Sequence, residues 1–217
     1  MRVFIGIKLS QFSNLYYKEL SDEIKKYCSK GNFHNLNNYH MTLYFIGDID
    51  EDKLAQIKNI CEEVSKNIKK FSVSTGVLNS FDKKNRKILW FGLSDGSLEM
   101  QNLYKLLRDE FKKYGFDIDE RFTPHLTIGR NVLLDNIDLA EISDGLNYRE
   151  YKSEISELIL FESKRVSDAL IYDPISKFEF KDWLLNYIYY YSLLNFKLYK
   201  KVQKKFNAYN KLEISVQ

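Results

Sequence analysis

Two short stretches of the sequence repeat one spacing of side chains that can carry out chemistry. His40-Met41-Thr42-Leu43 and His125-Leu126-Thr127-Ile128 each place a threonine two positions after a histidine and an aliphatic residue after that. The chain contains three histidines, so the repeat uses two of them. In a β-strand, side chains at positions i and i+2 lie on one face. We therefore expect two strands, each with a histidine and a threonine facing a groove and an apolar back against a core.

Two imidazoles and two hydroxyls directed at one small anion suit acid–base attack on a phosphodiester. One imidazole can remove a proton from the attacking water while the other protonates the departing ribose oxygen, since the unperturbed pKa of histidine is about 6.5. The hydroxyls of Thr42 and Thr127 can donate to the non-bridging phosphate oxygens and hold the phosphorus in line. This chemistry needs no metal, and the sequence has no zinc-ligand spacing of cysteines or histidines. We expect neither a metal nor another cofactor.

The composition indicates a globular protein. Of the 217 residues, 44% are hydrophobic and 29% are charged, which allows one large domain or two intimate lobes. Cys28 and Cys61 are not clustered, which favours buried thiols in a reducing compartment over a disulfide scaffold. The first apolar run is too short for a signal peptide. We expect a cytoplasmic monomer.

The net charge of +3 is unevenly distributed along the chain. From Lys181 to the end there are seven lysines and two acidic residues, which leaves a net charge of −2 on the first 180 residues. Apolar residues in the same segment recur at steps of three and four, which predicts a basic amphipathic helix too short in apolar length to span a bilayer. We predict a two-lobed domain over 1–180 and a helical extension over 181–217, whose lysines face solvent or, alternatively, contact RNA or an anionic membrane.

The elements around the two motifs follow one another in a similar order in both halves. We expect strands and helices to alternate, with polar segments between them, over these ranges: strand 2–8, helix 12–29, turn 32–38, motif strand 39–46, helix 51–69, strands 71–78 and 86–93, helix 97–114, a second motif strand from 125, loop 132–150, strands 151–161 and 171–180. The two motifs are 85 residues apart, each after a strand and a helix. This order predicts two related lobes with a groove between them.

With these residues in view, the chain resembles the two-histidine phosphoesterases, specifically the RNA 2′,3′-cyclic phosphodiesterases, also called 2′-5′ RNA ligases. The stretches that carry the resemblance are Arg2–Ile7, Tyr39–Gly47, Leu89–Leu93, Phe122–Arg130 and Leu160–Ser163. The resemblance covers about residues 1–180 and implies a bilobal α+β fold, with an antiparallel sheet in each lobe, flanking helices and a pseudo-symmetric central groove. It implies that a 2′,3′-cyclic phosphate on RNA is opened to a 2′-phosphate. It further implies that His40 is the proton donor and His125 the proton acceptor that activates water.

Four more residues bear on the site. Arg130 matches the family's arginine and is predicted to contact phosphate, although its odd offset from His125 would point it away from the groove in a regular strand. Tyr44 shares the parity of His40, and Phe122 precedes the second motif, so either could stack a nucleobase, with core packing favoured for Phe122. His34 has no threonine partner and is predicted to be an ordinary surface residue.

Several alternatives remain open at this stage. Within the same chemistry, the chain could join RNA ends through a 2′-5′ linkage or act on a small cyclic nucleotide. From another class, it could be a non-catalytic module that binds RNA ends, although histidine and threonine are intact in both motifs. A third reading, a membrane-associated or partner-docking protein, depends on the C-terminal segment. The expected partner is RNA with a 2′,3′-cyclic phosphate end, or a nucleoside 2′,3′-cyclic phosphate, and the chain is not expected to be an integral membrane protein.

Overall fold

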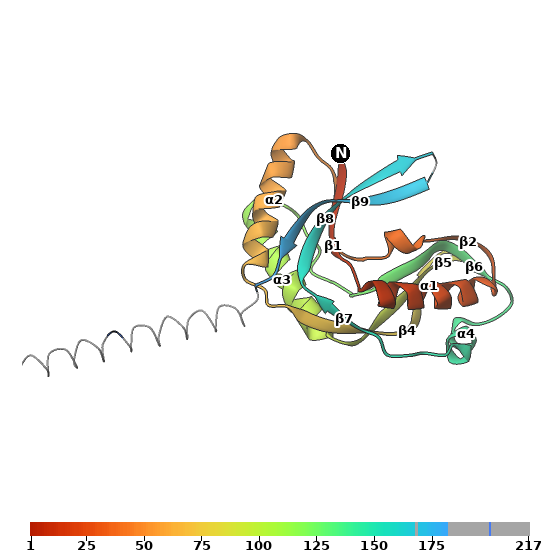
Figure 1. The fold of residues 1–217 in the computed structure, drawn as a ribbon. Helices are drawn as coiled ribbons and strands as arrows, with labels where there is room; N and C mark the ends of the chain where they lie inside the picture. Colours follow the sequence, from red (N-terminus) through yellow and green to blue (C-terminus); the bar gives the residue numbers. More distant parts are fainter. Residues whose placement is uncertain (168, 182–199, 201–217) are drawn as a thin grey trace, which may run out of the picture. The chain divides into compact units, whose positions relative to one another are not determined.

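Two antiparallel β-sheets organise the computed structural model, which describes residues 1–167, 169–181 and 200 (Figure 1). The first sheet has the order β3-β1-β8-β9 and contains β1 (Arg2–Ile7), β3 (Met41–Asp48), β8 (Glu157–Val166) and β9 (Ala169–Glu179). The second sheet has the order β2-β6-β5-β4-β7 and contains β2 (Cys28–Phe33), β4 (Phe71–Lys83), β5 (Arg86–Asp95), β6 (Leu126–Leu134) and β7 (Lys152–Ile155). The predicted α+β fold with two antiparallel sheets is confirmed.

Four α-helices flank the sheets in the described part of the chain. They are α1 (Gln11–Lys25), α2 (Glu51–Ser65), α3 (Ser97–Lys113) and α4 (Leu139–Gly145), and a short 3₁₀ helix, η1 (Leu36–Asn38), precedes the first motif. Helices α1 and α4 contact strands of the second sheet, whereas α2 contacts the first sheet and packs against α3. Ser10 and Asp50 accept hydrogen bonds from backbone N–H groups in the first turns of α1 and α2, which fixes where these helices begin.

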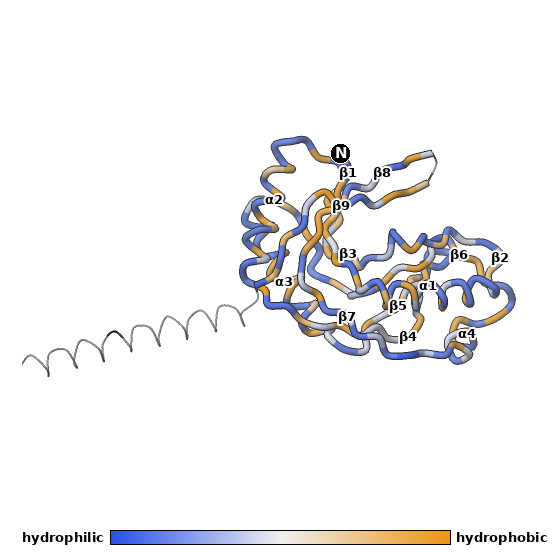
Figure 2. Tube along the Cα trace, viewed as in Figure 1, coloured by the Kyte–Doolittle hydropathy of each residue, from blue (hydrophilic) through white to orange (hydrophobic). Residues whose placement is uncertain are grey.

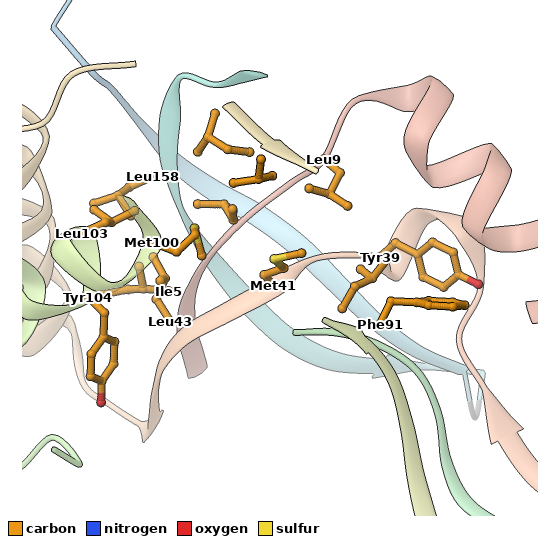
Figure 3. Packing of buried hydrophobic residues seen from close by; sticks show 14 of the residues in the cluster. Ile5, Leu9, Tyr39, Met41, Leu43, Phe91, Met100, Leu103, Tyr104 and Leu158 are labelled. Atoms are coloured by element: carbon orange, nitrogen blue, oxygen red, sulfur yellow. The ribbon is translucent and has the colours of Figure 1, made fainter. Parts of the chain in front are cut away.

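One hydrophobic core joins the two sheets. Its buried residues come from strands of both sheets and from the helices that cover them. Figure 3 shows Met100 and Leu103 of α3 beside Ile5 and Leu158 of the first sheet, with Phe91 of the second sheet farther along the same layer. Figure 2 shows hydrophobic residues along the central strands and hydrophilic residues along much of the helices. The two lobes are therefore not independent, because they share the apolar layer behind the groove.

Each motif begins a strand in a different sheet. Strand β3 starts at Met41, directly after His40, and β6 starts at Leu126, directly after His125. Met41, Leu126 and Ile128 are fully buried, as expected for the apolar backs of these strands. The prediction of two motif strands is confirmed, with each histidine at the entrance of its strand.

Some predicted boundaries are wrong because long-range pairing overrides the local pattern. Helix α1 ends at Lys25, and Cys28 lies in β2, where it is opposite Leu134 of β6, although the apolar helical spacing continues past that point. The segment 132–150, predicted as a loop, contains the end of β6 and helix α4. The predicted strand 151–161 is two strands, β7 and β8, which belong to different sheets. Both cysteines are free thiols, and Cys61 is buried.

Residues Met1–Lys181 form one compact unit. The predicted helical extension, 181–217, lies outside the described residues except for Lys181 and Lys200, so its character stays a prediction. Within the described residues, every helix is too short or too polar to cross a membrane.

Candidate active site

The groove is a cavity of about 620 Å³ that is lined by residues of both sheets and by both motif histidines. Its lining residues are Arg2, Phe4, His40, Thr42, Phe45, His125, Arg130, Ser163, Arg165, Leu170 and Tyr172. Thr127 is buried and is not among the described residues that line the groove. The structure therefore brings His40, Thr42, His125 and Arg130 together, whereas Thr127 lies behind the surface.

His40 is held in one orientation by hydrogen bonds at both ring nitrogens. Its Nδ1 lies 2.7 Å from the carbonyl oxygen of Asn38, and its Nε2 lies 2.9 Å from Oγ1 of Thr42. A carbonyl only accepts, so Nδ1 carries the proton of the neutral ring and Nε2 accepts from the Thr42 hydroxyl. The rings of Phe4 and Tyr172 enclose the imidazole, each at 4.8 Å between ring centres. The Thr42 hydroxyl therefore helps to fix the position of Nε2, the nitrogen that we expect to react.

Burial makes His40 a weak proton acceptor. Loss of water around the ring lowers its pKa to about 3, although the Asn38 carbonyl favours the charged form. The positive charge of Arg130 and the neighbouring His34 lower the pKa further. A proton on His40 therefore needs a compensating negative charge, which an anionic substrate can supply.

His125 repeats this arrangement on the opposite side of the groove. Its Nδ1 lies 2.7 Å from the carbonyl oxygen of Thr123, two residues earlier, just as His40 bonds to the residue two positions before it. The rings of Phe81 and Trp90 lie edge-on to the imidazole, at 5.1 and 5.7 Å. Burial lowers the pKa of His125, and the Thr123 carbonyl opposes this effect. Both imidazoles are therefore anchored through Nδ1, which leaves Nε2 for chemistry.

A β-bulge turns Arg130 into the groove. Along the pairing of β5 with β6, Trp90 is opposite Thr127 and Leu89 is opposite Gly129, so one step on β5 matches two steps on β6. This extra residue lies between His125 and Arg130 and reverses the alternation, which explains why counting from His125 pointed Arg130 the wrong way. A second register shift lies between Gly129 and Val132, where Asn131 adopts the left-handed region with φ of 54°.

Comparisons with known proteins agree with this geometry. A family model described as the 2′-5′ RNA ligase superfamily matches residues 17–165. The chain belongs to this superfamily. An RNA 2′,3′-cyclic phosphodiesterase of Aquifex aeolicus is 30% identical over 82% of this chain and 96% of the relative. Another protein of that name, from Thermotoga maritima, is 24% identical over 86% of this chain and 100% of the relative.

Solved structures of low identity share the fold of this superfamily member. A protein of Thermus thermophilus has a TM-score of 0.66 at 15% identity, covering 82% of this chain and 97% of its own. Escherichia coli LigT complexed with 3′-AMP has a TM-score of 0.60 at 17% identity, covering 83% of this chain and 98% of its own. At these identities the two structures support the fold alone.

Tyr44 and Phe122 line a neighbouring cavity of about 460 Å³, not the groove itself. The Tyr44 hydroxyl donates to the carbonyl oxygen of Asp117 at 2.9 Å, and the Phe122 ring stacks on Tyr104 at 4.3 Å. Thr42, Phe45 and His125 line both this cavity and the groove, so the two spaces adjoin at the motif residues. The predicted nucleobase contacts of Tyr44 and Phe122 stay predictions.

Phe45 and Tyr172 are among the groove residues that sequence reasoning missed in this 2′-5′ RNA ligase superfamily member. Phe45 is 49% exposed, with the Arg2 guanidinium 5.0 Å above its ring, because register shifts between β1 and β3 break the alternation counted from His40. Tyr172 comes from β9, far along the chain, and no local pattern marks it. The prediction that His34 is an ordinary surface residue is wrong.

His34 lies directly after β2, beside β6 and the groove residue Tyr172. Its backbone N–H donates to the carbonyl oxygen of Ile128 at 2.8 Å, and its ring is edge-on to Tyr172 at 6.2 Å. Within the described residues, its buried Nδ1 has no hydrogen-bond partner. Burial lowers its pKa to about 4, and the charge of Arg130 acts in the same direction. All three histidines of the chain therefore belong to one neighbourhood.

Proposed function

We propose that this protein hydrolyses the 2′,3′-cyclic phosphate at the end of an RNA, or of a nucleoside, to a 2′-phosphate. The observation that carries the proposal is the pair His40 and His125, each anchored through Nδ1 to a backbone carbonyl and each lining the same groove. Membership of the 2′-5′ RNA ligase superfamily and relatives that are named RNA 2′,3′-cyclic phosphodiesterase support the same chemistry.

The proposed steps use the side chains in the following roles. His125 Nε2 removes a proton from water as the water oxygen attacks phosphorus, while protonated His40 gives its proton to the 3′ oxygen as the P–O3′ bond breaks. The product is a 2′-phosphate monoester and a free 3′ hydroxyl. Arg130, as a fixed cation in the groove, would neutralise the phosphate oxygens. Thr42 is proposed to bind phosphate and also to direct His40 Nε2, whereas the phosphate contact of Thr127, which does not line the groove, stays a prediction.

We expect substrate binding to raise the low proton affinity of His40. The cyclic phosphate carries a negative charge that favours the imidazolium form, which opposes the desolvation that lowers the His40 pKa. His40 is therefore expected to carry its catalytic proton only when the anionic substrate is bound. Neither ligation, nor a small cyclic nucleotide, nor non-catalytic RNA-end binding has a specific contact among the described residues that favours it over hydrolysis.

The proposal is tested with a nucleoside 2′,3′-cyclic phosphate in the presence of EDTA. We expect the 2′-monophosphate, and we expect His40→Ala and His125→Ala each to lower kcat by about 10²-fold or more. Met41→Leu is the matched control, because Met41 is adjacent to His40 but fully buried in the core. A 3′-monophosphate product, activity that returns only with a divalent ion, or a folded histidine variant with unchanged kcat would contradict the mechanism.

We further propose that the protein acts as a monomer in the cytoplasm. One chain supplies both histidines and Arg130 to the groove, so catalysis needs no residue from a second copy. The two free thiols fit a reducing compartment. Sedimentation at assay concentrations should give the mass of one chain, and activity per chain should not depend on protein concentration.

A further inference from the structure

A third cavity, of about 210 Å³, adjoins the groove at Arg130, which lines both. Its lining residues come from the end of β4, the start of β5 and the bulge of β6, and they are Lys83, Arg86, Lys87, Ile88, Arg130 and Asn131. Four of these six side chains are basic and none is acidic. Because the first 180 residues carry a net charge of −2, this concentration of positive charge is not a consequence of a generally basic surface.

Most of this positive charge is not neutralised within the protein. Lys87 pairs with Asp82 at 2.8 Å, and Arg86 Nη1 donates to the carbonyl oxygen of Asn131 at 3.5 Å. For Lys83, Arg86 and Arg130, no carboxylate lies within ion-pair distance among the described residues. The cavity therefore presents cations to whatever enters it.

The hairpin between β4 and β5 fixes these cations in place. Lys83 is directly opposite Arg86 in the last cross-strand pair, and Lys84 has φ of 58°, as a tight two-residue turn requires. Two like charges directly opposite each other destabilise a sheet. A polyanion bound at the hairpin would remove this repulsion, so the unfavourable pair itself points to an anionic ligand.

We propose that Lys83, Arg86, Lys87 and Arg130 form a basic tract that binds the phosphodiesters of a single RNA strand upstream of the cyclic phosphate. This inference rests on the proposed function, because it takes the cyclic end in the groove as the fixed point. A cyclic phosphate occupies the 3′ end, so the strand can leave the groove only in its 5′ direction. Arg130 belongs to both cavities and marks where the strand passes from one to the other.

An aromatic side chain accompanies the tract. Phe81 is on the same hairpin, is 37% exposed, and lies edge-on to His125 at 5.1 Å. Sites for single-stranded nucleic acid combine a positively charged path for the backbone with aromatic faces on which bases stack. The tract and Phe81 supply both parts beside the groove, so the preferred substrate is an oligoribonucleotide and not a mononucleotide.

The test compares the full-length wild type with the double variant Lys83→Gln/Arg86→Gln. Neither residue lines the groove, so kcat on a nucleoside 2′,3′-cyclic phosphate should be unchanged. The second substrate is a single-stranded oligoribonucleotide of about eight nucleotides with a 2′,3′-cyclic phosphate end. Loss of two phosphate contacts, at a slope of about 0.7 each, should reduce the salt dependence of log affinity by about 1.4. If the wild type and the double variant bind equally at 1 M salt, this difference in slope predicts that the variant binds the oligonucleotide roughly tenfold more weakly at 0.15 M salt.

The matched control is Lys53→Gln/Lys105→Gln, which removes the same charge from exposed positions of α2 and α3 that line neither cavity. Weaker oligonucleotide binding by Lys83→Gln/Arg86→Gln alone supports the proposal, whereas equally weakened binding by both double variants would overturn it. A wild type with no oligonucleotide preference and no salt dependence would also overturn it while leaving hydrolysis intact. If the nucleoside is not hydrolysed, the proposed function fails, and binding of the same oligonucleotide measured by fluorescence anisotropy still decides the tract.

Discussion

Burial of His34 and His40 predicts that the folded protein loses stability as the pH falls below about 6.5. The pKa of His34 is lowered to about 4 and that of His40 to about 3, whereas in the unfolded chain both imidazoles titrate near 6.5. Between these values the unfolded chain binds protons that the native state does not bind. The free energy of unfolding therefore falls as the pH falls, and this contribution is fully present only above about 6.5.

The size of the effect follows from the two pKa values. At pH 5 the solution is about 1.5 pH units below the unfolded pKa, and each unit is worth about 1.4 kcal/mol per histidine. Each of the two side chains then costs about 2 kcal/mol, or about 4 kcal/mol together, against a typical total stability of about 5–15 kcal/mol. His125 acts in the same direction, because burial lowers its pKa as well.

The assay is urea unfolding at pH 8, 7, 6 and 5 for the wild type and His34→Asn. The variant should lose about 2 kcal/mol less than the wild type between pH 8 and pH 5, because one of the two titrating groups has been removed. Carboxylates contribute equally to both proteins and cancel in this difference. Lys105→Gln, at an exposed position of α3, is the control and should keep the wild-type pH dependence. An identical pH dependence in wild type and His34→Asn would refute the buried placement of His34.

Three further predictions concern the groove. The pH profile of kcat/KM should be bell-shaped with its maximum below pH 6.5, because both motif imidazoles have lowered pKa values in the free protein, and a rate that is constant through pH 8 would count against the pair. Asn131→Val should raise KM for a nucleoside 2′,3′-cyclic phosphate by about tenfold, because a β-branched residue with φ of 54° is strained and relief of the strain displaces the adjacent Arg130, whereas Asn131→Gly should not; equal KM values would contradict this role of Asn131. Removal of residues 182–217 should leave kcat on the same substrate nearly unchanged, since the described residues that line the groove all lie between Arg2 and Tyr172, and a soluble but inactive truncated protein would disprove it.

The sequence alone determined the two motif strands and the type of fold. The spacing of His40 and Thr42, and of His125 and Thr127, carries its structural meaning locally, because alternation along a strand depends on the backbone of a few residues. The same local rule correctly predicted that Met41 and Leu126 are buried. Membership of the superfamily could likewise be inferred, since these motifs keep their order along the chain.

The remaining features of the site depend on contacts between residues far apart in the sequence. Arg130 reaches the groove only because β6 bulges against β5, and Tyr172 is brought beside His40 by a strand more than a hundred residues later. His34 looks polar and exposed in its own segment, yet pairing of β2 with β6 carries it beside the groove residue Tyr172. The lowered pKa of His40 likewise comes from surrounding rings of distant strands. Register, bulges and burial are set by the packing of whole sheets, which is why only the tertiary structure decided them.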